Sequence, residues 1–469
     1  MKQISKGFLL LLVILISVEA YAMNLNEYMQ VVKTKNKIFQ GLSSSLEAAN
    51  EKLISGDAAL SPVLTAGYSL ASDKSLPSSL GDERKDTQYT LGIAKRFSTG
   101  TAVALSARTD QFQNKTANPP LDQFSTGGLG ISLTQSLWKD FFGTGTRLRQ
   151  DRESALNQFE TTRIDLQIRA AIFDAESVFW DYAFAQDDLK LKKSNLERAQ
   201  RLEKWTSNRV SNGISDRADL MNVKALAALR EVQYLTAQDE IKTQETKLRE
   251  YMGIENSELT PDVNENAVLA RDAVKELAKS NKNIIKIDSY LASLEAKTKQ
   301  FVAAEIKDSL RPDLALTASY GTSAYNREYP EVTKNIAETD RPKTFVGLNF
   351  SWAFDTDAKS AVLSSATKDA LAAQYAAERN LVLGKNAWTD LLRKYEITKQ
   401  NLMTLEKIAQ FQRERVKAEQ DKFNKGRTVT ANVVTAETDA AEAEVTYLKS
   451  LSGLRKLEAS SILFISVPN

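Results

Sequence analysis

The chain has 469 residues, with 62 lysines and arginines against 60 aspartates and glutamates, and it contains neither histidine nor cysteine. Without imidazole or thiol groups it cannot form Ser-His-Asp or Cys-His triads, zinc or haem sites of the usual ligands, or disulfides. The net charge of only +2 argues against a nucleic-acid partner, because nucleic-acid binders usually carry a basic excess.

The amino terminus has the pattern of a secretory signal peptide. Two lysines precede a mostly apolar run at residues 8–18, and Ala20-Tyr21-Ala22 has the small-x-small pattern of a cleavage site. The apolar run is well short of the ~20 residues that a membrane-spanning helix needs. We therefore expect residues 1–22 to be a signal peptide, and residues 23–469 to be exported without a transmembrane helix.

The strand-like segments alternate apolar residues with small or polar ones, which predicts a sheet with one apolar face. Strands are predicted at 62–72 and 127–138 in the first half and at 312–321 and 345–354 in the second, and an extra hairpin at 88–109. This pattern suits either a soluble antiparallel sheet or a barrel wall with lipid outside and water inside. Aromatic residues at the strand ends favour the membrane, where they would lie at the interface: Trp138, Phe141, Phe142, Trp352 and Phe354.

Two long tracts predict helical hairpins. Residues 146–252 contain one glycine, Gly213, and residues 348–452 contain only Gly384 and Gly426, so both tracts can hold long helices. Apolar and aromatic residues recur every seven positions on both sides of Gly213, as in a coiled coil, and the series repeats 213 residues later. The tyrosines of this series are predicted to pack between helices rather than to form a substrate ladder: Tyr182, Tyr234, Tyr395 and Tyr447.

The repeated series indicates an internal duplication. Residues 23–254 form the first repeat, with its hairpin tip near Gly213, and residues 255–469 form the second, with its tip near Gly426. Six strands are too few to close a barrel, because the smallest outer-membrane barrels need about eight. If the strands face lipid, several chains must share one barrel.

The chain resembles the TolC-like outer membrane efflux proteins. The resemblance rests on the signal peptide, the duplicated order of strands and helical hairpin, the strand ending Ser132-Leu-Thr-Gln-Ser-Leu137, and the glycine at each tip. It covers nearly the whole mature chain and implies that residues 24–61 and 266–311 are the opening helices of the two repeats. The implied fold is mainly helical, with long coiled-coil hairpins and strands that join a shared trimeric transmembrane β-barrel.

The resemblance also implies a location and partners. A homotrimer would sit in outer-membrane lipid, with its helices extending through the periplasm. It would act as a passive exit duct of an efflux or type I secretion system, receiving substrates from an inner-membrane pump through a periplasmic adaptor. No cofactor, metal or enzymatic activity is expected. The resemblance does not name the substrate, which in the family is a drug, a metal or a protein.

The tips are the candidate periplasmic aperture. Family members commonly have acidic residues a few positions after the tip glycine, and Asp219 falls on such a position, whereas the second tip has Asn432 and Thr435 there. A carboxylate repeated three times around a narrow axis favours cations and can hold a gate shut. Equally, Ser215 could cap the next helix while Asp216 and Asp219 complement its dipole. The aperture candidates are Asp216, Arg217, Asp219, Arg427, Thr428 and Asn432.

Two questions stay open on the sequence alone. The strand pattern does not decide whether the hairpin at 88–109 enters the barrel. The competing function is an exported structural coiled-coil envelope protein without channel activity. It differs from a channel in whether the apolar strand faces contact lipid.

Overall fold

The computed structural model describes residues 23–75, 83–115, 123–254, 273–279 and 283–467. The predicted signal peptide, residues 1–22, and the predicted start of the second repeat, residues 255–272, lie outside the described residues. Among the described helices, none has a stretch long and apolar enough to cross a membrane.

The chain divides into two compact units that do not coincide with the two repeats. The sheet unit comprises Ser45–Ile164 and Asp288–Leu383, and the helical unit comprises Met1–Ser44, Asp165–Ile287 and Gly384–Asn469. Each unit therefore combines segments from both halves of the sequence.

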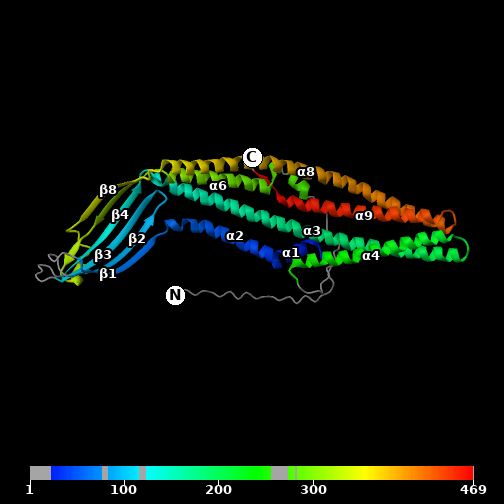
Figure 1. The fold of residues 1–469 in the computed structure, drawn as a ribbon, viewed down its shortest axis with the longest axis horizontal. Helices are drawn as coiled ribbons and strands as arrows, with labels where there is room; N and C mark the ends of the chain where they lie inside the picture. Colours follow the sequence, from blue (N-terminus) through cyan, green and yellow to red (C-terminus); the bar gives the residue numbers. More distant parts are fainter. Residues whose placement is uncertain (1–22, 76–82, 116–122, 255–272, 280–282, 468–469) are drawn as a thin grey trace. The chain divides into compact units, whose positions relative to one another are not determined.

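The sheet unit is built on an antiparallel sheet with strand order β1-β2-β3-β4-β6-β8, in which the short β7 also pairs with β4 (Figure 1). The hairpin predicted at 88–109 appears as β2 and β3, longer than predicted and inside the sheet. The strands are β1 (Val63–Asp73), β2 (Glu83–Arg96), β3 (Thr101–Lys115), β4 (Gln123–Ser136), β6 (Asp313–Gly321), β7 (Ala324–Asn326) and β8 (Lys343–Ser351).

Helices adjoin the sheet within this unit. The short helix α7 (Tyr329–Asn335) packs on β3 and β4, where the hydroxyl groups of Tyr329 and Thr109 lie 3.1 Å apart and Val332 is 1% exposed. The unit also holds η1 (Asp57–Leu60), η2 (Phe141–Gly143), nearly all of α6 (Ile287–Ser309) and the sheet-proximal parts of α2 (Lys37–Gly56), α3 (Thr144–Ser211) and α8 (Thr356–Asn424).

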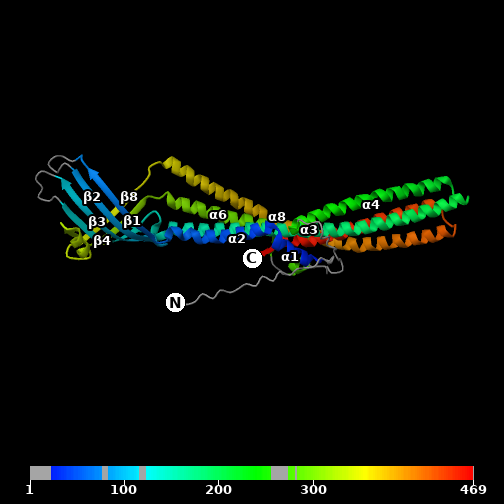
Figure 2. The same ribbon diagram turned by 90° about the horizontal axis from the view of Figure 1, so that it is seen from below.

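The helical unit contains the far parts of α3 and α8 together with α4 (Arg217–Met252) and α9 (Thr430–Ser460). Figure 2 shows these four long helices running side by side, as two hairpins. The unit also holds α1 (Leu25–Lys35), α5 (Ala273–Ala278), β5 (Asn283–Lys286), η4 (Ser461–Leu463) and β9 (Phe464–Val467). The mainly helical fold with long hairpins and a sheet is as predicted.

The segments 24–61 and 266–311, expected to hold the opening helices, each contain helices with an interruption. In the first, Asn36 separates α1 from α2: its backbone is extended, its side-chain amide donates to the Tyr251 carbonyl at 2.8 Å, and its side-chain oxygen accepts from the Ile38 N–H at 2.8 Å. In the second, β5 interrupts the helix and pairs antiparallel with β9. Both interruptions depend on residues distant in sequence, so helical periodicity alone did not reveal them.

Two equivalent apolar clusters hold the helical hairpins together. One surrounds Tyr182, which is 2% exposed, and includes Phe179 and Leu248; the other surrounds Tyr395, which is 1% exposed, and includes Trp388. Burial of each such large side chain stabilises the fold by roughly 1.5–3 kcal/mol. The packing role predicted for the heptad tyrosines therefore holds at these two positions, while Tyr234 and Tyr447 are only half-buried.

A layer of charged side chains lies among the four long helices. The Arg198 guanidinium of α3 contacts the Glu437 carboxylate of α9 at 3.0 Å, and Arg230 of α4 donates to the Glu437 carbonyl at 3.3 Å. Two turns further along α9 from that pair, Glu444 is 9% exposed and contacts Arg413 of α8 at 2.9 Å. Burial raises the pKa of Glu444, against the opposing effect of the nearby arginines.

This raised pKa predicts a pH-dependent stability for Glu444→Gln. The protonated form is favoured in the folded state, so the stability linked to this proton is fully present below the ordinary pKa of 4.5 and is lost as pH rises through the folded pKa. The glutamine variant lacks that loss and should melt at a higher temperature than the parent at neutral and alkaline pH. Loss of the Arg413 pair should matter little, because Arg413 is 56% exposed.

The measurement is the melting temperature of the purified protein from acid to alkaline pH. The control is Glu442→Gln, at an exposed position of the same helix, which should track the parent at every pH. A difference between Glu444→Gln and the parent that does not shrink toward acid pH would contradict the assigned cause.

Candidate functional site

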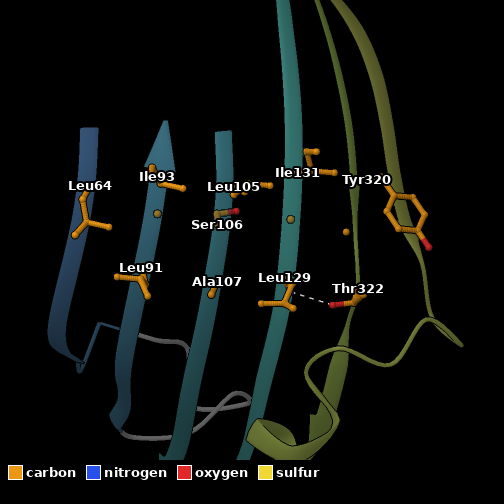
Figure 3. A pocket seen from close by; sticks show the side chains of 13 residues that line it. Leu64, Leu91, Ile93, Leu105, Ser106, Ala107, Leu129, Ile131, Tyr320 and Thr322 are labelled. Carbon is orange, nitrogen blue, oxygen red and sulfur yellow. Dashed lines mark hydrogen bonds between the residues drawn. The ribbon is translucent and has the colours of Figure 1, made fainter. Parts of the chain in front are cut away.

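Large apolar side chains stand in register across one face of the sheet. Figure 3 shows them lining a shallow apolar hollow that crosses the strands from β1 to β6. Their side chains are between 39% and 70% exposed, and an exposed apolar surface of this extent marks a contact with protein or membrane. One row, in which each residue is the direct partner of the next, contains Leu64, Ile93, Leu105, Ile131 and Tyr320.

The opposite face carries small and polar residues. Within it the Arg108 guanidinium pairs with the Asp110 carboxylate at 2.8 Å, and the Gln88 amide donates to the same carboxylate at 2.8 Å. The sheet therefore has the two-faced character of a barrel wall between lipid and water. The row behind the one just described contains Thr65, Gly92, Ser106, Gly130 and Gly321.

Aromatic side chains bound the apolar face at both ends. The predicted interface residues Trp138, Phe141, Trp352 and Phe354 gather after the ends of β4 and β8, with exposures from 41% to 77%. At the other end, the rings of Tyr68, Tyr89 and Tyr329 lie in contact, with centroid separations of 5.2 and 6.2 Å. Sequence reasoning missed this second cluster, because Tyr329 joins it only through the packing of α7.

The distance between the two aromatic clusters fits a bilayer. Tyr89 is in register with Gly127 of β4 through Thr109, and Trp138 follows the same strand. The 11 steps from Gly127 to Trp138 span about 36 Å along a strand and about 28 Å at a strand tilt of ~40°. Outer-membrane barrels have an apolar band of about 25 Å between aromatic girdles.

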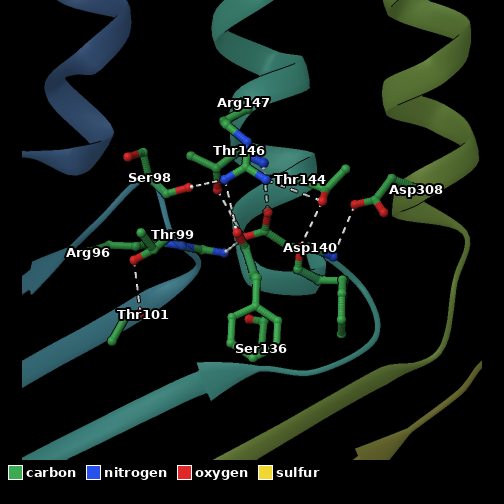
Figure 4. Close-up of polar contacts among 12 residues, drawn as sticks. Arg96, Ser98, Thr99, Thr101, Ser136, Asp140, Thr144, Thr146, Arg147 and Asp308 are labelled. Carbon is green, nitrogen blue, oxygen red and sulfur yellow. Dashed lines mark hydrogen bonds and ion pairs between the residues drawn. The ribbon is translucent and has the colours of Figure 1, made fainter.

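Asp140 holds the junction where β4 leads into α3 (Figure 4). One of its carboxylate oxygens accepts the Thr146 backbone N–H at 2.7 Å. The other accepts the Thr146 hydroxyl at 2.9 Å and the Arg96 guanidinium at 2.8 Å. The Asp140 backbone N–H donates to the Asp308 carboxylate of α6 at 3.0 Å. This single buried side chain thus joins the start of α3, the end of β2 and, through its backbone, α6.

The chain at this junction adopts left-handed backbone conformations. The φ angle is 53° at Asp140, 43° at Phe142 and 81° at Gly143. A Cβ atom on Gly143 would lie 1.8 Å from the Ser98 carbonyl oxygen, so the tip of the β2–β3 hairpin packs directly on the junction. Arg147 bridges the two segments by donating to the carbonyls of Phe142 at 2.9 Å and Ser98 at 3.4 Å.

The two helical tips have the same backbone structure. Gly213 and Gly426 have φ angles of 69° and 70°. In each tip the glycine N–H donates to the carbonyl three residues back at 3.0 Å, and the next N–H donates to the carbonyl five residues before it at 2.8 Å. This is the glycine-terminated helix end that needs a left-handed residue, and its recurrence matches the sequence repeat.

The first tip places its acidic residues at the start of α4. Asp216, not Ser215, occupies the N-cap position, and its side chain makes no capping hydrogen bond. The Ser215 hydroxyl instead donates to the Asp219 carboxylate at 3.0 Å. The capping role considered for Ser215 is therefore wrong, although Asp219 still lies in the first turn, where a carboxylate complements the helix dipole. Arg217, the first residue of α4, is exposed.

The second tip contains a carboxylate that sequence reasoning missed. The Asn432 amide donates to the Thr428 hydroxyl at 3.0 Å, and that hydroxyl donates to the Glu419 carboxylate at 3.0 Å. Lys422 also pairs with Glu419 at 2.8 Å, and hydrogen bonds from Lys422 and Thr428 lower the pKa of Glu419. Glu419 lies seven residues before the tip glycine, whereas the acidic positions typical of the family lie after it. Arg427 is exposed.

The tips of the two hairpins lie together in the helical unit. The rings of Trp205 on α3 and Phe423 on α8 have centroids 4.3 Å apart, and the Arg209 guanidinium lies 4.7 Å from the Trp205 ring. Beneath them, Val223 of α4 and Val433 of α9 are both fully buried. The acidic residues of both tips are therefore carried by one packed set of four helices.

Comparison with solved structures identifies the fold. No protein-family model and no curated protein matches the sequence. The chain is similar to the outer-membrane channel OprN, with a TM-score of 0.67 and 17% identity over 93% of this chain and 89% of that one. It is also similar to the outer membrane protein VceC of Vibrio cholerae, with a TM-score of 0.66 and 15% identity over 93% and 94% of the two chains.

A third similar structure is the open state of the MtrE outer membrane channel of Neisseria gonorrhoeae, with a TM-score of 0.63 and 14% identity over 93% and 88% of the chains. The chain thus has the TolC-like fold of these outer-membrane channels along nearly its whole length. The resemblance inferred from the repeat is confirmed at the level of the fold.

The close packing at Gly143 makes a specific prediction for Gly143→Ala. A Cβ atom would meet the Ser98 carbonyl and would also force a side chain into a left-handed conformation, so we expect a loss of more than ~2 kcal/mol in stability. Gly453→Ala is the matched control, because a Cβ there meets nothing within 4 Å. The measurement is thermal unfolding of the purified protein. Equal melting temperatures for the two variants would show that the junction is not closely packed.

Proposed function

We propose that the chain is the outer-membrane channel subunit of an envelope export system. It would act as a passive duct for substrates that an inner-membrane pump delivers through a periplasmic adaptor. The observation that carries the proposal is the sheet whose apolar face lies between two aromatic clusters at bilayer spacing. Its continuation into two long helical hairpins, in the fold of known outer-membrane channels, supports the same conclusion.

The channel is proposed to be a homotrimer in outer-membrane lipid. Among the described residues, the sheet is six strands wide, with β7 beside β6 on β4, and has open edges at β1 and β8, so it has too few strands to close by itself. In lipid every backbone hydrogen-bonding group needs a partner, so a sheet with open edges requires neighbouring chains. The long hairpins would then extend from the membrane into the periplasm, with their tips meeting around the symmetry axis.

The tips are proposed to form the aperture. Asp219 in the first tip and Glu419 in the second would each be repeated three times, which gives two rings of carboxylates. The Ser215 and Thr428 hydroxyls hold these carboxylates in place. Glu419 is partly neutralised by Lys422, so its ring should attract cations less strongly than the ring of Asp219.

The competing function, an exported structural coiled-coil protein, predicts that the apolar sheet face is covered by protein rather than by lipid. The two functions are separated by recovery of the mature protein. A channel is expected only in detergent extracts of the outer membrane, as a stable trimer that conducts ions in planar bilayers. Release by a salt wash as a soluble, non-conducting protein would rule the channel out.

The transported substrate is tested in a null strain. Restoring the gene should restore resistance to dyes and antibiotics if the system is an efflux pump, and protein secretion if it is a type I exporter. The control is a gene lacking residues 83–254 and therefore the first helical hairpin. If neither phenotype is restored although the trimer conducts, the partner system proposed here is wrong.

The proposed rings predict how multivalent cations block the channel. Asp219→Asn and Glu419→Gln should each raise the concentration of hexaamminecobalt(III) needed for half-block, and the double variant should raise it by about tenfold or more. Single-channel recording measures this directly. Asp239→Asn, at an exposed position on α4 away from the tip, is the control and should leave the block unchanged. If the double variant is half-blocked at the same cation concentration as the parent, the cation site lies elsewhere.

A further inference from the structure

The β2–β3 hairpin occupies the middle of the sheet rather than one side of it. β1 pairs with β2 along its whole length, from Val63 to Asp73, and β3 pairs with β4 from Thr101 to Gln113. In the part of the chain that the structure describes, β1 and β4 do not pair with each other. The sheet is continuous only because the hairpin joins its two sides.

The hairpin has the same two faces as the strands on either side. On the apolar face, Ile93 and Leu105 continue the row that runs from Leu64 to Ile131. Because successive side chains along a strand alternate between faces, the hairpin supplies small and polar residues to the other face, such as Ser106, which is in register with Gly92 and Gly130. A hairpin that lay inside or outside the barrel would not need an apolar face and a polar face in register with those of the wall strands.

The tip of the hairpin is fixed to the strand-to-helix junction. Arg96, the last residue of β2, pairs with Asp140, and the Gln135 amide of β4 donates to the Thr99 carbonyl in the hairpin turn at 3.1 Å. The Ser136 N–H donates to the Gly100 carbonyl at 3.2 Å. These contacts hold β2 and β3 at the level of the wall strands.

The two edges of the sheet are complementary. With six strands in antiparallel order, β1 and β8 run in opposite directions, so β1 of one copy can pair antiparallel with β8 of the next. Both edge strands carry apolar residues on the same face of the sheet, including Leu64 on β1 and Leu348 on β8. At the end away from the helices, β1 finishes with Asp73 and β8 begins with Lys343, which have opposite charges.

We propose that β2 and β3 are wall strands, so that three copies of this chain close a barrel of 18 strands in which β1 of each copy pairs with β8 of the next. The proposal rests on the proposed membrane-channel function. Each copy supplies six strands, since β7 continues the register of β6 along β4 and adds no separate position in the wall. Without the hairpin each copy would supply four, and three copies would close a barrel of 12.

The difference sets the width of the exit through the membrane. Barrel diameter grows roughly linearly with strand number, so 18 strands give a barrel about 1.5 times as wide as 12. At a strand spacing of about 4.8 Å and a tilt of about 40°, the backbone diameters are about 36 and 24 Å. The hairpin would therefore widen the duct at the membrane without any change in the helical hairpins.

Electron cryomicroscopy of the mature protein in lipid nanodiscs tests the strand number. We expect 18 wall strands, and 12 in a variant that lacks residues 83–115, because β1 and β4 also run in opposite directions and can then pair. A trimeric barrel of 12 strands in the full-length protein, with the hairpin beside the wall, would overturn this inference and leave the channel function standing. Failure to form any membrane-embedded barrel would instead overturn the channel function.

Cysteine labelling tests the two faces of the hairpin without relying on the deletion variant. The chain has no cysteine, so each introduced thiol is the only one present. Ile93→Cys on β2 should react with a lipid-soluble maleimide but not with a water-soluble one. Ser106→Cys on β3 should react with the water-soluble maleimide but not with the lipid-soluble one. The matched controls on β4 are Ile131→Cys and Ser132→Cys. Equal aqueous labelling of the two hairpin positions, while the β4 pair still differs, would place the hairpin outside the wall.

Discussion

The unpaired backbone groups along the two edges of the sheet are the constraint on which the remaining structure depends. In hydrocarbon an unsatisfied N–H or C=O group costs several kcal/mol, and an open sheet cannot lie there. In water, the same sheet would expose an apolar face that runs across six strands, from β1 to β8. Both difficulties are removed together when copies join edge to edge with their polar faces inward. The sheet therefore makes the proposed channel depend on other copies of the chain.

The junction around Asp140 connects the last residues of β4 to the first residues of α3. Two non-glycine residues there, Asp140 and Phe142, adopt left-handed conformations, which cost roughly 1–2 kcal/mol each. Three hydrogen bonds to the Asp140 carboxylate and one from its backbone offset this strain. Because Arg96 is one of the donors, the same carboxylate also sets the level of the β2–β3 hairpin. One buried side chain, Asp140, thus holds both the start of α3 and the end of the β2–β3 hairpin in place.

The two helical tips have the same backbone structure but carry different charges. The pair Ser215 and Asp219 is equivalent to Thr428 and Asn432, and both pairs are joined by a hydrogen bond of 3.0 Å. In the second tip the carboxylate stands on the preceding helix, at Glu419, and Thr428 reaches it by a second hydrogen bond. A negative group is therefore present at both tips, although acidic residues closely follow the glycine only in the first tip.

The sequence by itself determined the features that repeat over short distances. Alternation along β4 and β8, seven-residue spacing along the long helices, and the glycines at both tips are local patterns, so they predicted the helical hairpins and the strand faces. The break at Asn36, the pairing of β5 with β9 and the position of the extra hairpin between β1 and β4 were decided only by the tertiary structure. The same is true of the contacts of Asp140 and Glu419. Each of these depends on a partner outside the local pattern, often far away in the chain, and periodicity carries no information about which distant residues meet.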